Sequence, residues 1–96
     1  MLRIKIELNY IIIMNNMKQI LLGLWNGERD MDVTLNGREA CVSKLRNGTM
    51  VVESKRERAE VTGNKWTATE LEDGSIEGVV YWRSFAYKIR LVPVED

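Results

Sequence analysis

The sequence predicts a mainly all-β protein: an antiparallel meander forming a small barrel or a sandwich, with one short N-terminal helix. Three observations predict it. Tight-turn dipeptides recur along the chain, the segments between them alternate apolar and polar residues, and one apolar stripe has helical spacing. With 96 residues the chain is too short to fill a second core, so residues 1–96 are expected to form a single β domain. Residues 1–14 are expected to be an arm or an edge strand.

The N-terminal segment contains one strand pattern and one helix pattern. Apolar residues at positions 2, 4, 6 and 8 alternate with polar residues, most of them charged, which predicts a half-buried strand. Asn15 or Asn16 then offers a side chain that can cap a helix. The expected helix has one apolar face with spacing i, i+3, i+4 and i+7, formed by Met17, Ile20, Leu21 and Leu24.

Turn dipeptides divide the rest of the chain. Each accepts a positive φ at little cost, as tight hairpins require, and most of them are Asn-Gly or Asp-Gly pairs. They are Asn26-Gly27, Asn36-Gly37, Asn47-Gly48, Gly63-Asn64 and Asp73-Gly74. The strands expected from alternation are 38–45, 49–55, 65–71, 76–82 and 85–92.

Two segments have more than one interpretation. Residues 53–60 (ESKRERAE) carry balanced charges and are expected to form an irregular, solvated turn between two short strands, with the exposed part of one bent strand or a single helical turn as alternatives. The strand 76–82 is apolar on both faces, which is typical of a strand that is central or is covered by a second subunit.

Charge and residue usage exclude several kinds of function. Lys plus Arg and Asp plus Glu are 14 each, so the formal net charge is zero. This balance disfavours nucleic-acid binding, and it favours a homo-oligomer because self-repulsion is removed. The chain has no histidine, which excludes Ser–His–Asp and Cys–His catalysis and every His-containing metal site. No enzyme activity, cofactor or metal is expected.

The cellular location follows from the cysteine count and the N-terminus. Cys41 is the single cysteine, which rules out an intrachain disulfide and fits a reducing compartment. The N-terminal apolar run is interrupted by Glu7 and Asn15 and lacks a signal-peptide cleavage site. No stretch approaches the ~20 apolar residues that span a bilayer. We therefore expect a cytoplasmic protein with no membrane partner.

Two polar features have both a chemical and a structural interpretation. Glu28, Asp30 and Asp32 would share one side of an extended strand and could hold a cation, but a solvated, charged edge strand is favoured. For Cys41, a buried structural thiol is favoured over a nucleophile, because no histidine is available to activate it.

Aromatic and basic residues concentrate in the expected C-terminal hairpin. Rings interleaved with cations can hold single-stranded nucleic acid by stacking and charge. The competing interpretation, favoured by the balanced net charge, places the rings in the core and the cations in solvent. The residues concerned are Tyr81, Trp82, Arg83, Phe85, Tyr87, Lys88 and Arg90.

Gly23-Leu24-Trp25 resembles the G-x-W triplet at the start of the first barrel strand in lipocalins and related small-ligand carriers. The resemblance covers these three residues. It implies that Trp25 closes the floor of a barrel and packs against a basic side chain from late in the chain, for which Arg83, Lys88 and Arg90 are the candidates.

Three function hypotheses follow. The first is a non-enzymatic binding module, a β-cup that holds a small apolar ligand; its alternative is that the same aromatic residues simply fill the core. The candidate lining is Trp25, Trp66, Tyr81, Trp82 and Phe85. The second is a protein-interaction role, as a homodimer or with a partner such as a toxin or a regulatory enzyme. The third is single-stranded nucleic-acid binding through Arg83, Lys88 and Arg90 of the C-terminal hairpin.

Overall fold

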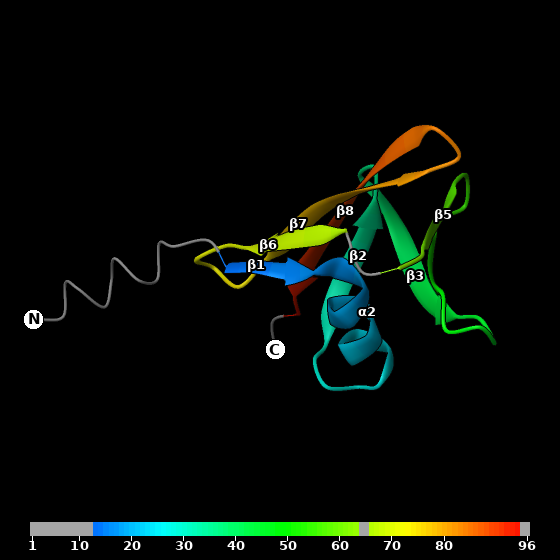
Figure 1. Ribbon diagram of the computed structural model, residues 1–96. Coiled ribbons are helices and arrows are strands. Elements are labelled where there is room, and N and C mark those ends of the chain that lie inside the picture. The colour runs from blue at the N-terminus through cyan, green and yellow to red at the C-terminus, as the bar shows by residue number, and fades with distance from the viewer. Residues whose placement is uncertain (1–12, 64–65, 95–96) are drawn as a thin grey trace, which may run out of the picture.

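The computed structural model describes residues 13–63 and 66–94, which form one helix and a single antiparallel sheet (Figure 1). The expected strand over residues 2–8 lies outside the described residues. The elements are β1 (Ile13–Asn16), α2 (Met17–Trp25), β2 (Met31–Leu35), β3 (Arg38–Lys44), β4 (Met50–Glu53), β5 (Arg58–Val61), β6 (Thr67–Glu70), β7 (Ile76–Trp82) and β8 (Phe85–Pro93). The mainly antiparallel β class and the short N-terminal helix are therefore confirmed.

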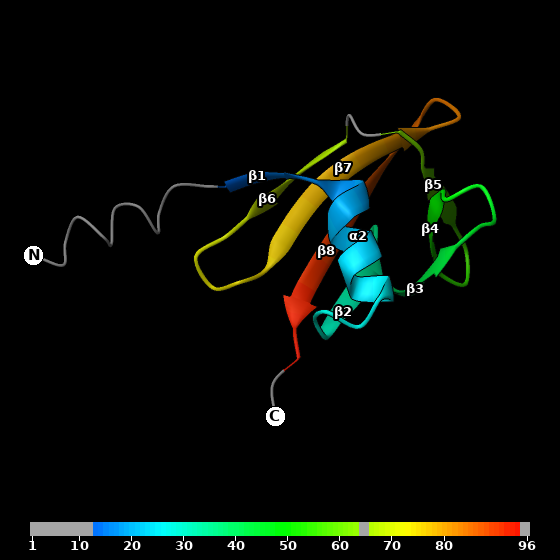
Figure 2. The same cartoon turned by 60° about the horizontal axis from the view of Figure 1, so that its bottom comes forward.

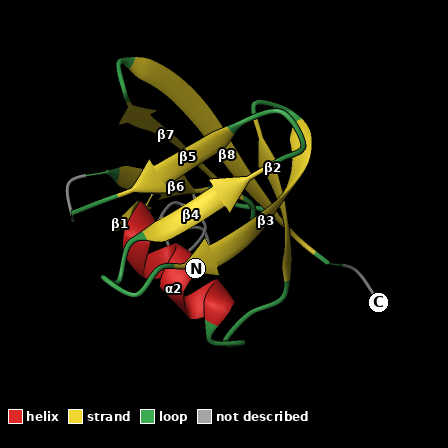
Figure 3. Cartoon of the chain, turned by 90° about the vertical axis from the view of Figure 1, so that its right-hand side faces the viewer, coloured by secondary structure: helices red, strands yellow, loops and turns green. Residues whose placement is uncertain are grey.

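The strand order shows how the sheet is assembled. The order is β1-β6-β7-β8-β2-β3-β4-β5, so two meanders, β6 to β8 and β2 to β5, are joined by the pairing of β8 with β2. The sheet curls into a half-barrel, and β5 packs across from β7 without joining it in the hydrogen-bonded order. Figure 2 shows α2 lying across β7 and β8, and Figure 3 shows it beside β3 and β4, against which it packs.

The helix begins where the sequence predicts. Asn16 is the N-cap: its Oδ1 accepts hydrogen bonds from the backbone N–H groups of Lys18 at 2.8 Å and Gln19 at 3.3 Å. The expected apolar face is directed into the fold, since Met17 and Leu21 are fully buried and Leu24 packs against the core. Within the described residues, no helix is long and apolar enough to cross a bilayer.

Side chains from α2 and from the sheet fill the interior of the half-barrel. Ile76 and Val80 of β7 and Ile89 and Leu91 of β8 are completely buried against residues of α2 and of the β4–β5 hairpin. The helix approaches β7 closely at Gly78. A Cβ at that position would lie 2.5 Å from Met17 Cε and 2.9 Å from the backbone oxygen of Thr67. Gly78 therefore lets the helix sit on the sheet.

One local expectation is confirmed and one needs correction. Within residues 53–60, Ser54–Glu57 forms the expected turn between two short strands, β4 and β5. The expected charged edge strand through Glu28, Asp30 and Asp32 is wrong. Glu28 and Asp30 lie in the loop after α2, and only Asp32 lies on a strand. That strand, β2, is internal to the sheet because it pairs with both β8 and β3.

Candidate binding groove and hairpin arm

A groove opens where β2 and β3 separate. The two strands pair only from Leu35–Arg38 to Val33–Ala40, after which β2 pairs with β8 alone and β3 pairs with β4 alone. The last turn of α2 and the start of β2 flank the opening. Because the facing edges of β2 and β3 are both unpaired here, residues from the inner and the outer side of each strand line the same space.

The groove has a volume of about 920 Å³ and is open to solvent. This is at the upper end of the ~300–1,000 Å³ typical of ligand pockets. Its apolar residues are Leu24, Trp25, Met31, Val33, Ala40 and Val42, and its polar and charged residues are Asp32, Thr34, Glu39, Cys41, Glu53, Ser54 and Lys55. Three carboxylates against one ammonium group give the lining a formal charge of −2.

Trp25 is the one of the five expected ligand-lining aromatics that lies in this groove. It is the last residue of α2, and 49% of its surface is exposed. The strand implied by the lipocalin resemblance is wrong, because Gly23-Leu24-Trp25 is the final turn of a helix and not the start of a strand. Trp25 thus offers an exposed apolar surface in the groove. The sequence pointed to this residue for a different reason, its place in the G-x-W triplet.

Cys41 also lines the groove and is exposed, which corrects the expectation of a buried thiol. The cause is its parity in β3: Cys41 pairs with Glu53, whereas the inward positions are those of Ala40 and Val42. Because inner and outer positions alternate along a strand, an apolar neighbourhood in sequence does not bury the residue between two inward ones.

At the other end of the sheet, β7 and β8 continue as a two-stranded ribbon, residues 79–88, which we call the hairpin arm (Figure 1). The pairing of β6 with β7 ends at Gly78, and the pairing of β2 with β8 ends at Ile89. The arm is held at its base by Asn36, whose N–H donates to the carbonyl oxygen of Lys88 and whose Oδ1 accepts from the N–H of Lys88, both at 2.8 Å.

The tip of the arm is a two-residue turn whose residues adopt a backbone conformation that is unfavourable for their side chains. Arg83 and Ser84 have φ of 55° and 70°, the left-handed region that Asn and Gly tolerate best. The Arg83 guanidinium carbon lies 4.6 Å from the ring centroid of Trp82, a cation–π contact that fixes the basic side chain at the tip. The sequence shows no turn dipeptide here, and only the alternation of the flanking strands predicts the hairpin.

The arm has a covered face and an exposed face. Val80 is fully buried and Tyr87 nearly so on the inner side, while Val79 is 41% and Tyr81 55% exposed on the outer side. Phe85 at the tip is 64% exposed. The strand 76–82, predicted to be central or covered by a second subunit, is therefore internal to the sheet but bare on its outer face.

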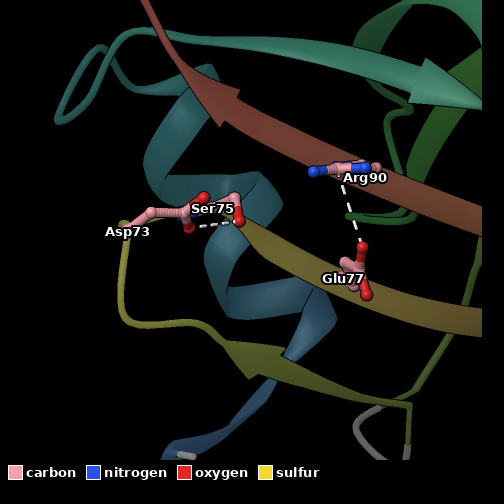
Figure 4. Close-up of polar contacts among 4 residues, drawn as sticks. All are labelled: Asp73, Ser75, Glu77 and Arg90. Atoms are coloured by element: carbon pink, nitrogen blue, oxygen red, sulfur yellow. Dashed lines mark hydrogen bonds and ion pairs between the residues drawn. The ribbon is translucent and has the colours of Figure 1, made fainter. Parts of the chain in front are cut away.

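The arm carries positive charge and no negative charge. Arg83 and Lys88 are its ionisable cations, and residues 79–88 contain no Asp or Glu, so its formal charge is +2. The ion pairs among the described residues are Arg58–Glu60 at 3.4 Å and Arg90–Glu77 at 3.7 Å (Figure 4), so neither cation of the arm has a carboxylate partner there. Arg90, in contrast, lies below the arm and is paired.

The remaining predicted aromatics gather at the arm and away from the groove. The Trp66 ring lies against Tyr81 with centroids 5.6 Å apart and planes tilted by 41°, and Trp66 and Trp82 both pack on the core. The indole N–H of Trp66 is buried, and none of the described residues accepts a hydrogen bond from it. The structure thus separates the exposed members of the five: Trp25 lines the groove, Tyr81 lies on the outer face of the arm, and Phe85 lies at its tip.

Several groove residues could not be predicted from the sequence. Met31, Glu39 and Glu53 carry no motif, and they meet only because β2 and β3 diverge. Within residues 13–63 and 66–94, no cluster of three or more His, Cys, Asp or Glu side chains has the arrangement of a metal site. Comparisons with protein-family models, curated proteins and solved structures give no match.

Proposed function

We propose that this protein is a non-enzymatic binding module whose groove beside Trp25 receives an apolar group, such as a small apolar ligand. The observation that carries the proposal is the half-exposed Trp25 in a groove that the apolar side chains of Leu24 and Val42 also line. An exposed aromatic ring beside an open apolar groove is a surface that gains free energy when water is displaced from it. The absence of histidine and of nucleophile motifs in the sequence supports a role without catalysis.

The test uses a neutral, apolar fluorescent naphthylamine as the probe. We expect saturable binding to the folded protein, and Trp25→Ala should weaken it about tenfold, equivalent to about 1.4 kcal/mol of lost apolar contact. Val94→Ala is the control, because it removes an exposed apolar side chain from a site outside both the groove and the hairpin arm. The proposal is wrong if the protein does not bind the probe, or if Trp25→Ala binds it as tightly as the parent chain.

A second candidate function is protein interaction through the hairpin arm. The specific observation is the combination of Tyr81 and Phe85, both more than half exposed, with Arg83 at the tip. Tyr and Arg are enriched among the residues that contribute most to protein–protein affinity. A paired two-stranded ribbon also presents these side chains with little conformational entropy left to lose on binding.

A further inference from the structure

We infer that the groove of one molecule receives the hairpin arm of a second copy, so that the protein associates with itself through these two surfaces. The inference rests on the proposed function, because it requires the groove to accept an apolar group. It goes further by naming the group: the exposed ring of Phe85 at the tip of the arm, next to Arg83.

Charge is the first argument for a second copy. The groove lining has a formal charge of −2 and the arm has +2, and neither Arg83 nor Lys88 has a carboxylate partner among the described residues. Docking the arm would bring these cations to Asp32, Glu39 and Glu53. Opposite potentials on two contacting surfaces steer association and disfavour partners of the wrong sign.

Shape and apolar surface are the second argument. The groove is open and holds about 920 Å³, which suits a protruding group, and its exposed Trp25 would pack on the Phe85 ring of the incoming tip. The arm extends beyond the pairing of β6 and β2, so its outer face and tip are accessible to another molecule. Each surface supplies what the other lacks: a groove lined by apolar and acidic side chains, and a protruding arm with an exposed aromatic ring and basic side chains.

The whole-chain charge is consistent with this arrangement. A formal net charge of zero means that two copies do not repel each other at long range. If each arm occupies the other molecule's groove, the contact is isologous and closes as a two-fold dimer, the commonest symmetry of soluble oligomers.

The experiment measures the weight-average mass by sedimentation equilibrium from low micromolar concentration to about 1 mM, which detects dimers as weak as millimolar. We expect the mass to rise toward that of two chains, and the rise to weaken in high salt because exposed charges are screened. Two charge-reversed proteins provide the decisive comparison. The groove variant carries Glu39→Lys and Glu53→Lys, and the arm variant carries Arg83→Glu and Lys88→Glu.

Alone, each variant places like charges in contact, and its self-association should fall about 100-fold or more. Mixed in equal amounts, the two should form a heterodimer, because the positive arm of one meets the negative groove of the other and the reversed arm meets the reversed groove. Damage to the fold could not be repaired by mixing. Lys44→Glu with Arg46→Glu is the matched control, with the same charge change as the arm variant on exposed residues outside both surfaces.

Each other outcome overturns the inference. A parent chain that stays monomeric to about 1 mM has no such contact, and naphthylamine binding that depends on Trp25 would then leave the proposed function standing alone. Association that both charge-reversed variants retain runs through a different surface. Tight binding of single-stranded oligonucleotide by a monomer, lost in the arm variant, would assign the arm to nucleic acid instead.

Discussion

Replacing Gly78 by Ala tests how the helix is seated on the sheet. The added Cβ would lie 2.5 Å from Met17 Cε and 2.9 Å from the carbonyl oxygen of Thr67, with the Cα of Ala68 at 3.4 Å. The Met17 side chain is flexible, but it is fully buried and has little free volume in which to move. The Thr67 oxygen belongs to the neighbouring strand and moves only if β6 shifts.

The expected cost follows from two opposing terms. Overpacking of a filled core costs about 1–3 kcal/mol. Replacing glycine inside a strand returns about 0.5–1 kcal/mol, because alanine has less conformational entropy to lose on folding. The free energy of unfolding should therefore fall by about 1–2 kcal/mol in Gly78→Ala, which lowers the Tm of a chain of this size by roughly 5–15 °C.

Urea denaturation followed by tryptophan fluorescence and circular dichroism measures this loss. Gly23→Ala is the matched control: its Cβ meets only the carboxylate end of Glu28, at 3.3 Å, and alanine favours a helix by up to about 1 kcal/mol. The two substitutions should thus have opposite signs. If Met17 is the obstacle, Met17→Ala and Gly78→Ala combined should cost less than their separate costs added together. A Gly78→Ala protein as stable as the parent would refute the reasoning.

Two further predictions concern the turns. Ser84→Gly should raise the free energy of unfolding by about 1 kcal/mol, because it removes a side chain from a left-handed position. The control Ser43→Gly, within β3, should lower the free energy of unfolding. A destabilised Ser84→Gly protein would contradict the strain attributed to the φ of 70° at Ser84. Hydrogen bonds to Asp73 Oδ1 from the Ser75 hydroxyl (2.6 Å) and backbone N–H (2.9 Å) hold the pKa of this carboxyl below its ordinary value of 3.8 (Figure 4). A carboxyl with a lowered folded pKa stabilises the fold above its unfolded pKa, and this contribution disappears as the pH falls through the folded pKa. The stability advantage of the parent over Asp73→Asn should therefore shrink below about pH 4, as pH-dependent denaturation would show, and an advantage constant down to pH 2 would contradict it.

The sequence predicts the parts of the fold that depend on neighbouring residues. Asn16 caps the helix because its side chain reaches N–H groups two and three residues ahead, and the apolar stripe that starts at Met17 defines the buried face. Asn36-Gly37 forms a tight turn because both residues accept positive φ, and β7 matches the expected strand 76–82. These features need no knowledge of the rest of the chain.

The features that the sequence misses depend on distant pairing. In β5, Ala59 and Val61 face inward while Arg58 and Glu60 pair on the outside, and the charge density hides this alternation. Cys41 is exposed because of the register of β3 with β4, which no local pattern specifies. The groove exists only because β2 pairs with β3 over a few residues, so its lining joins segments with no shared motif.

The groove and the arm have the same structural origin. In both places a strand continues after its neighbour has stopped pairing with it: β3 continues past Ala40 without β2, and the β7–β8 ribbon continues past Gly78 and Ile89 without β6 and β2. Matched strand lengths would make the single chain more stable. Each unpaired strand edge lacks backbone hydrogen bonds, and each exposed ring, at Trp25 or Phe85, contributes little buried apolar area. In a single chain the groove and the arm both stay exposed to solvent, whereas contact between two chains would bury them against each other. The charge-reversal experiment distinguishes a monomer with two exposed surfaces from a dimer in which they are covered.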